Sequence, residues 1–219
     1  MSQHKIYELQ KACHDCRKCP LGQKQVDGHD PHVFGSGHVN ATVMFVAEAP
    51  GAEEVKIGRP LVGRSGQFYE NRILKGAGLE RSQVYTTNAA LCRPSEKNRT
   101  PFPGEMEICR DHLDAQILLV NPRLIVTLGN ASLYSVCETQ GITKKRGSLR
   151  WSRVWSDGRR VPVLPMFHPA YCLRGSGLKE MKTDIERLER WSKGLMVGNI
   201  PIEEDVRCLC DLTSAAEAA

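Results

Sequence analysis

Two short, almost wholly apolar segments, each followed directly by a polar turn, constrain the fold of this chain most. Residues 42–47 (TVMFVA) precede Glu48-Ala49-Pro50-Gly51, and residues 161–167 (VPVLPMF) precede His168-Pro169. Such segments are typical of strands that are buried on both faces of a parallel sheet. Because the carboxyl ends of parallel strands meet at one edge, where ligands normally bind, we expect Glu48 and His168 to share one pocket.

A carboxylate and an imidazole in one pocket suit the cleavage of a bond whose transition state separates charge, since each group can face charge of the opposite kind. Taken alone, each residue has a simpler explanation: His168 precedes a proline and could be purely structural, and Glu48 could only cap a turn. Together with Asn88, which lies in a further predicted strand, they favour a catalytic site.

The rest of the chain alternates between strand-like and helix-like patterns. Further strands are predicted over residues 84–91 and 123–129, and residues 151–168 have the pattern of a hairpin that turns at Asp157-Gly158. Helices are predicted over residues 5–13, 65–77, 104–120, 129–135 and 178–195. This alternation predicts an α/β fold, a three-layer α/β/α sandwich around a mostly parallel four-stranded sheet.

The length of 219 residues suits one domain, which we place at residues 1–195, followed by a loose tail over residues 196–219. No apolar run approaches the roughly 18 residues that span a bilayer, and the N-terminus lacks the apolar core of a signal peptide. We therefore expect a soluble, cytoplasmic protein with no membrane partner; we also expect it to be monomeric. The formal net charge of +5 permits a polyanionic partner such as DNA.

Nine cysteines in a chain without an export signal argue for free thiols or metal ligands, because the cytosol keeps thiols reduced. Cys16 and Cys19 form a C-x-x-C pair, and Cys92 and Cys109 form a second locus with sixteen residues between them. Four thiolates suit tetrahedral zinc or a [4Fe-4S] cluster, and the wide second spacing favours the cluster. Cys13 and Cys16 also have C-x-x-C spacing, so Cys13 stays an alternative to Cys16 or Cys19. The other cysteines are expected to be small buried apolar residues: Cys137, Cys172, Cys208 and Cys210.

A series of motifs, in a fixed order over residues 13–190, resembles family 4 uracil-DNA glycosylases. No single motif carries this resemblance, and their order makes it specific. The motifs are Cys16-x-x-Cys19-Pro20-Leu21, AEAPG from Ala47, GRPLVGRSGQ from Gly58, TNAALCRP from Thr87, NRTP from Asn98, the lone Cys109, ITKKRG from Ile142 and FHPAY from Phe167.

The resemblance implies a monofunctional DNA glycosylase that hydrolyses the N-glycosidic bond of uracil in single- or double-stranded DNA. It implies a structural [4Fe-4S] cluster held by Cys16, Cys19, Cys92 and Cys109. It implies catalysis by Glu48 and His168, and base contacts from Ala49, Glu54, Leu61 and Asn88. The Asn88 amide can accept from uracil N3–H and donate to O4, whereas cytosine presents the opposite pattern.

Departures from the family pattern keep a different or bulkier base open, such as a deaminated purine or a modified cytosine. Leu61 stands where the family usually has a phenylalanine, so an aromatic surface for stacking the base is missing. Phe68, Tyr69 or Tyr171 could replace that surface from another direction. Ala47 and Val55 also depart from the pattern.

A basic stretch and the segment after His168 are candidates for contacts with DNA. The stretch contains Lys144, Lys145, Arg146, Arg150, Arg153, Arg159 and Arg160. The resemblance implies that Leu173 enters the minor groove as an apolar wedge, with Arg174 pairing to phosphate. The simpler explanations are a solvated charged face and an ordinary connection.

Two other classes of function stay open. One is a catalytically inactive iron-sulfur module that only binds DNA, which Leu61 favours and the retained Glu48, Asn88 and His168 oppose. The other is a zinc-stabilised nucleotide hydrolase, which fits the α/β layers but lacks a glycine-rich phosphate loop.

Overall fold

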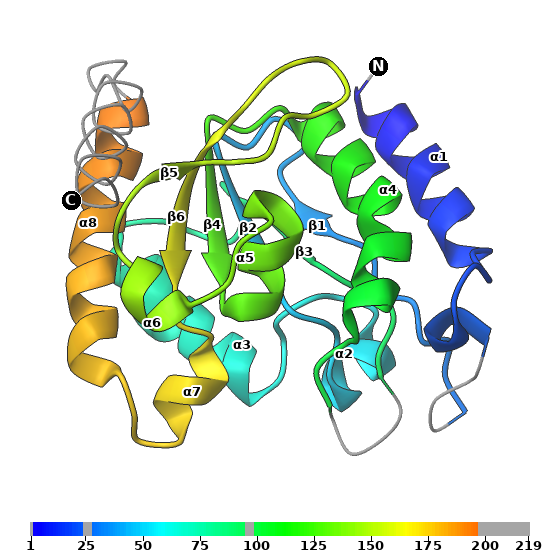
Figure 1. Cartoon of the computed structure of the whole chain (residues 1–219), viewed down its shortest axis with the longest axis horizontal. Coiled ribbons are helices and arrows are strands. Elements are labelled where there is room, and N and C mark those ends of the chain that lie inside the picture. The colour runs from blue at the N-terminus through cyan, green and yellow to red at the C-terminus, as the bar shows by residue number, and fades with distance from the viewer. Residues whose placement is uncertain (1, 24–27, 95–98, 197–219) are drawn as a thin grey trace, which may run out of the picture.

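Four parallel strands form the centre of a six-stranded sheet in the computed structural model, which describes residues 2–23, 28–94 and 99–196 (Figure 1). The strand order is β1-β3-β2-β4-β6-β5. The parallel strands are β2 (Val43–Ala47), β3 (Tyr85–Asn88), β4 (Leu124–Leu128) and β6 (Pro162–Met166). The short outer strands β1 (Ser36–Gly37) and β5 (Arg150–Trp151) run antiparallel to their neighbours. The predicted fold class is confirmed, with two short strands added at the edges.

The register of the parallel strands brings the polar turns to one edge of the sheet. Ala47 is opposite Asn88, and Leu128 is opposite Met166. The residues that follow β2 and β6, Glu48 and His168, therefore emerge at the same edge as Asn88. In Figure 1 the arrowheads of β4 and β6 point to this edge, where α2 (Ala52–Ile57) and α7 (Pro169–Leu173) lie.

Both faces of the sheet are buried, as the apolar strands require. Val43 and Phe45 point into one core, against Ile73 and Trp191, while Met44 and Val46 point into the other. The first core is covered by α3 (Arg64–Phe68), the π-helical turn η2 (Tyr69–Leu74) and α8 (Leu178–Met196), and the second by α4 (Pro103–Val120) and α5 (Asn130–Cys137). The N-terminal helix α1 (Ser2–His14) packs on α4 (Figure 1).

Most of the predicted elements are present with modest changes of boundary. The hairpin turn is confirmed, since Trp155 N donates to Arg159 O at 2.9 Å and Gly158 has a φ of 82°. The strand predicted over residues 84–91 ends at Asn88, and the helix predicted over residues 65–77 is divided between α3 and η2. The short helices η1 (Pro20–Gln23), α2, α6 (Ile142–Lys145) and α7 were not predicted.

Some predictions fall outside the described residues. They are the tail beyond Met196, which includes Cys208 and Cys210, and Asn98 of the NRTP motif. Within the described ranges, no helix combines the length and the apolar character that crossing a bilayer requires.

Candidate functional site

A cleft with a volume of about 640 Å³ opens at the carboxyl edge of the parallel strands. It brings together residues from four segments of the chain: the AEAPG turn, the loop before α3, the segment before α4 and the start of α7. The cleft is lined by most of the residues that were predicted to form a pocket or contact DNA at this edge. They are Glu48, Ala49, Glu54, Leu61, His168 and Arg174. The predicted meeting of Glu48 and His168 in one cleft is therefore observed.

Glu48 lies at the start of the turn after β2, half-buried in the cleft. Burial raises the pKa of its carboxyl group. A hydrogen bond from the Thr100 side chain and the positive charge of Arg174 act in the opposite direction. The carboxylate thus has partners that favour its charged form although the site removes water from it.

His168 is the N-cap residue of α7, and its ring is held as a neutral hydrogen-bond donor. Its Nδ1 accepts from the Ala170 backbone N–H at 3.2 Å. Burial, together with the positive charge of Arg174 and against an opposing effect of Glu54, lowers the pKa of the imidazole to about 4. A neutral ring that accepts at Nδ1 carries its proton at Nε2. His168 can therefore donate a hydrogen bond without adding a full positive charge.

Gly129, directly after β4, leaves room for this histidine. Its φ is 96°, and an added Cβ would lie 3.2 Å from the His168 Cβ. A larger residue would be strained here and would press on the imidazole.

Asn88 lies at the same sheet edge but is not among the residues that line the cleft. It is 1% exposed, and its side-chain Nδ2 has no hydrogen-bond partner among the described residues. Leaving a buried donor unpaired costs about 1–3 kcal/mol, so such a group calls for an explanation, of which a bound ligand is one. The unpaired amide is compatible with the predicted reading of a base edge.

The Glu54 carboxylate already accepts hydrogen bonds from three backbone N–H groups of this chain. Its Oε2 accepts from Gly51 N at 3.0 Å, and its Oε1 accepts from Val62 N at 2.9 Å and Gly63 N at 2.8 Å. The carboxylate thus joins the AEAPG turn to the loop before α3. The structure gives Glu54 a positioning role, and its contact with a base stays a prediction.

Leu61 lines the cleft in an unusual backbone conformation. It is 5% exposed and has a φ of 52°, in the left-handed region that side chains rarely adopt. The Arg81 guanidinium donates to Leu61 O at 2.8 Å and also to Pro60 O. An added Cβ on Gly66 would lie 2.0 Å from Leu61 O. Arg81 and Gly66 therefore hold a strained leucine in the wall of the cleft.

None of the aromatic side chains proposed to replace the missing phenylalanine lines the cleft. Tyr69 is fully buried in the core, where its hydroxyl is 2.9 Å from Thr86 Oγ1. Phe68 packs against the same core. Tyr171 is 38% exposed, with its ring 4.7 Å from that of Phe167. The expectation that one of them substitutes for the stacking surface is not supported.

The basic stretch does not form one free cationic face. Arg146 donates to Asp184 Oδ2 at 2.6 Å and to the backbone of Glu180, so its guanidinium is tied to α8. Further ion pairs join Arg153 to Asp114 and Arg159 to Asp157, and Lys145 donates to Thr139. Contacts of Lys145 and Arg146 with DNA stay predictions, and they would compete with these existing bonds.

The segment after His168 presents both predicted DNA-contact residues to the surface. Leu173 is 40% exposed at the end of α7, and Arg174 is exposed while also lining the cleft. The same Arg174 charge acts on Glu48 and His168. Their contacts with DNA stay predictions.

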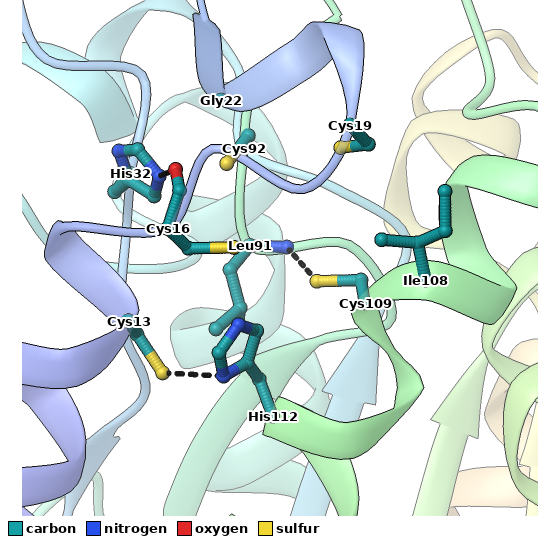
Figure 2. A pocket seen from close by; sticks show the side chains of 10 residues that line it. All are labelled: Cys13, Cys16, Cys19, Gly22, His32, Leu91, Cys92, Ile108, Cys109 and His112. Atoms are coloured by element: carbon teal, nitrogen blue, oxygen red, sulfur yellow. Dashed lines mark hydrogen bonds between the residues drawn. The ribbon is translucent and has the colours of Figure 1, made fainter.

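The four predicted cysteine ligands, Cys16, Cys19, Cys92 and Cys109, line one small cavity, and we call them the cysteine cage (Figure 2). The fold therefore joins the two loci, with Cys16 and Cys19 beside the segment after β3 and the first turns of α4. Leu91 N donates to Cys109 Sγ at 3.3 Å. Burial, helped by the proximity of Cys19 and Cys16 and opposed by the hydrogen bond from Leu91 N–H, raises the pKa of the Cys109 thiol to about 12.

Cys13 lines the same cavity, but its sulfur has another partner. Its Sγ is 3.0 Å from His112 Nδ1 (Figure 2). This contact makes Cys13 a poorer candidate for the ligand set than Cys16 and Cys19. Over residues 2–23, 28–94 and 99–196, no three His, Cys, Asp or Glu side chains are grouped as one metal ion requires.

Three residues near these sites carry contacts that the sequence analysis missed: Thr100, Arg81 and His112. Thr100 lies within the NRTP motif, so that motif was a usable signal for it. Arg81 donates hydrogen bonds to backbone oxygens 20 and 21 positions earlier in the chain, and no local sequence pattern predicts such a contact. His112 lies three positions after Cys109, a helical spacing that places both on one face of α4.

Comparisons with known proteins agree with this geometry. The sequence model of the uracil DNA glycosylase superfamily matches residues 34–192. A type-4 uracil-DNA glycosylase of Sulfurisphaera tokodaii is 40% identical over 172 residues, covering 76% of this chain and 74% of that protein. The type-4 uracil-DNA glycosylase of Thermotoga maritima is 37% identical, and the match covers 80% of this chain and 86% of that protein. That of Pyrobaculum aerophilum is 36% identical, and the match covers 84% of this chain and 92% of that protein. These matches show that the chain belongs to the uracil-DNA glycosylase superfamily.

Proposed function

We propose that this protein removes uracil from DNA by hydrolysing the N-glycosidic bond, without a covalent enzyme intermediate. The observation that carries the proposal is one cleft in which a partly buried carboxylate and a neutral, donor-oriented imidazole lie together. The type-4 uracil-DNA glycosylases that cover most of the chain support uracil as the base.

The proposal begins with a base outside the helical stack, because the bond cannot be reached inside a duplex. Asn88 is assigned to read the exposed edge of the base. Its unpaired Nδ2 would donate to uracil O4, and its Oδ1 would accept from N3–H. Cytosine would leave both groups mismatched, so the same amide would reject it.

Catalysis in this proposal depends on charge separation as the bond lengthens. Negative charge grows on the departing base, where His168 Nε2–H would donate to a carbonyl oxygen of the base. Positive charge grows on the sugar, which the Glu48 carboxylate would face while it orients the attacking water. Arg174 supports both roles, since its charge disfavours protonation of His168 and of Glu48.

We assign a [4Fe-4S] cluster to the cysteine cage as a structural cofactor. The donor set fits it, because four thiols surround one cavity and a backbone N–H already points at one sulfur. When bound, the cluster would tie the N-terminal segment to the chain after β3 and supply no redox step. The cage residues themselves only bind and orient.

A second candidate is excision of a base other than plain uracil. Leu61 favours it, because an aliphatic wall replaces a stacking surface and the described residues that line the cleft include no phenylalanine, tyrosine or tryptophan. A leucine leaves more room above the base plane and contributes less stacking energy. Both candidates use the same catalytic residues.

The test is excision from DNAs that differ only in the target base, in single-stranded and duplex form. We expect release of free uracil and an intact sugar-phosphate strand. We expect His168→Ala to lower the single-turnover rate by about 10²–10³-fold. A matched control is His38→Ala, at an exposed histidine remote from the cleft residues. Release of another base in preference to uracil would establish the second candidate, and an unchanged rate for His168→Ala would refute the assigned mechanism.

A further inference from the structure

Cys13, which is buried, and His112, which is half-buried, form a pair beside the cysteine cage that the proposed function does not use. Cys13 lies near the end of α1, and His112 lies on α4, one turn beyond Cys109. Their contact of 3.0 Å joins the two helices, and both side chains line the cavity of the cage (Figure 2). The pair is therefore placed where it can act on whatever the cage holds.

The contact between Cys13 and His112 determines where the ring proton lies. Cys13 is 2% exposed, and its thiol S–H can donate to Nδ1 at 3.0 Å. A neutral imidazole has one acceptor nitrogen and one donor nitrogen. With the thiol donating to Nδ1, the single ring proton is at Nε2.

His112 Nε2 is buried and has no hydrogen-bond partner among the described residues. Figure 2 shows the Nε2 edge of the ring on the side of the pocket where Leu91 and the cage sulfurs lie. The Leu91 side chain offers no acceptor, and its backbone N–H already donates to Cys109. Of the acceptor atoms that Figure 2 shows in this pocket, Cys16 O already lies 3.0 Å from His32 Nε2, and the others on this side of the ring are the cage sulfurs.

We propose that His112 donates a hydrogen bond from Nε2–H to a sulfur of the cluster assigned to the cage, and that Cys13 holds the ring in the tautomer that makes this possible. The inference rests on the cluster assigned under the proposed function. Hydrogen bonds to cluster sulfurs stabilise the more negative, reduced state and so raise the reduction potential. His112 and the Leu91 N–H would then supply two such donors. His112 is a positioning and tuning residue, remote from the cleft.

The experiment compares His112→Phe with His112→Gln in the full chain purified with its cluster. Phenylalanine keeps a flat ring without a donor, whereas glutamine places an N–H near the position of Nε2. The readout is the reduction potential from a titration followed by electron paramagnetic resonance, with iron and sulfide content measured in parallel. For His112→Phe we expect the ratio of reduced to oxidised cluster at a fixed ambient potential to fall about tenfold, equivalent to ~59 mV for one electron. His112→Gln should recover part of this change.

A second pair of variants tests the role of Cys13. Cys13→Ser keeps an O–H donor to Nδ1 and should leave the potential close to that of the unchanged protein. Cys13→Ala releases the ring and should shift the potential in the same direction as His112→Phe. Cys137→Ser, at a half-buried cysteine outside the cavity, is the matched control and should have no effect.

Three outcomes would overturn the inference. An unchanged potential in His112→Phe with full iron and sulfide content would refute it while leaving the cluster in place. A directly bound histidine nitrogen, detected as strong ¹⁴N coupling in pulsed resonance spectra, would make His112 a ligand instead of a donor. A purified protein without iron and sulfide would refute both the inference and the assigned cofactor, and uracil excision by that protein would show that the glycosylase proposal survives alone.

Discussion

At the scale of single residues, the sheet edge that carries the cleft has a buried polar group for which no described residue supplies a hydrogen bond. Asn88 is almost completely buried, yet its Nδ2 has no partner among the described residues. An unpaired buried donor destabilises the folded state by about 1–3 kcal/mol. Ligand-binding sites often contain such destabilising groups, because the groups that function requires are not always those that stabilise the fold.

Asn88→Leu should therefore separate stability from function. The substitution removes the unpaired donor while keeping a similar volume, so we expect the free energy of unfolding to stay equal or rise by about 1 kcal/mol. Uracil excision should fall by at least about tenfold, because one buried hydrogen bond to the base is worth that factor or more. Urea denaturation and single-turnover excision measure the two quantities. A large loss of stability would show that Nδ2 is satisfied in the folded protein.

His168 gives the protein a predictable dependence of stability on pH. The imidazole pKa moves from 6.5 in the unfolded chain to about 4 in the folded protein, facing Arg174 and Glu54. Between these values the unfolded state binds more protons, so the free energy of unfolding decreases as the pH falls from 6.5 towards 4.

We expect His168→Gln to remove this contribution. Urea denaturation at pH 7 and pH 5 should show the original protein losing more stability on acidification than the variant does, by about 1.4 kcal/mol for each pH unit in which only the unfolded histidine is charged. His38→Gln, at an exposed position, is the matched control and should follow the original protein. Parallel pH curves for the original protein and His168→Gln would contradict the low pKa.

At the scale of secondary-structure elements, a single carboxylate joins α2 to the loop that carries Leu61. Glu54 lies in α2, and its two oxygens accept from three backbone N–H groups at its own N-terminus and in the loop. Arg81 holds the same loop from its other side. The wall of the cleft is therefore rigid although it consists of connecting segments.

Glu54→Gln should loosen this wall. The amide keeps one acceptor oxygen but loses the charge and the second acceptor, so we expect the free energy of unfolding to fall by about 1.5–3 kcal/mol. Excision should slow as well, because Leu61 would be less well positioned. The matched control is Glu53→Gln, one residue earlier, whose exposed ion pair with Lys56 should contribute less than about 1 kcal/mol. Equal effects of the two variants would refute the joining role of Glu54.

Elements with continuous apolar patterns could be predicted from sequence, whereas those fixed by distant contacts could not. The strand at Val43–Ala47 is apolar throughout because both of its faces are buried, and its polar turn predicted the edge where the cleft lies. The helices α2 and α7 have only 6 and 5 residues, too short for a helical period to emerge. The left-handed Leu61 depends on Arg81, twenty positions later, so its conformation was not readable locally.

At the scale of the whole molecule, the cysteine cage connects the N-terminal segment to the middle of the chain. Cys16 and Cys19 lie just after α1, while Cys92 lies in the segment between β3 and α4 and Cys109 lies in α4. A cofactor in the cage would close a long loop that contains β2 and the AEAPG turn. Cross-links of this kind stabilise proteins by restricting the unfolded chain.

Loss of one cage ligand should therefore lower the stability of the whole protein. We expect Cys92→Ser to reduce the free energy of unfolding by about 2–4 kcal/mol, by analogy with other cross-links, and to reduce the bound iron. Cys137→Ser should change the stability by less than about 1 kcal/mol and leave the iron content unchanged. Denaturation with iron analysis distinguishes them, and equal stability of the two variants would refute the cross-linking role.

The two edge strands of the sheet affect how the protein behaves at high concentration. Strands β1 and β5 have only two residues each and run antiparallel to the strands that they flank. An edge strand of this length presents few unpaired backbone groups to another molecule, so it is a poor template for strand addition. Crowded solutions of the folded protein should accordingly resist fibrillar self-association, despite an interior rich in β-branched and aliphatic residues.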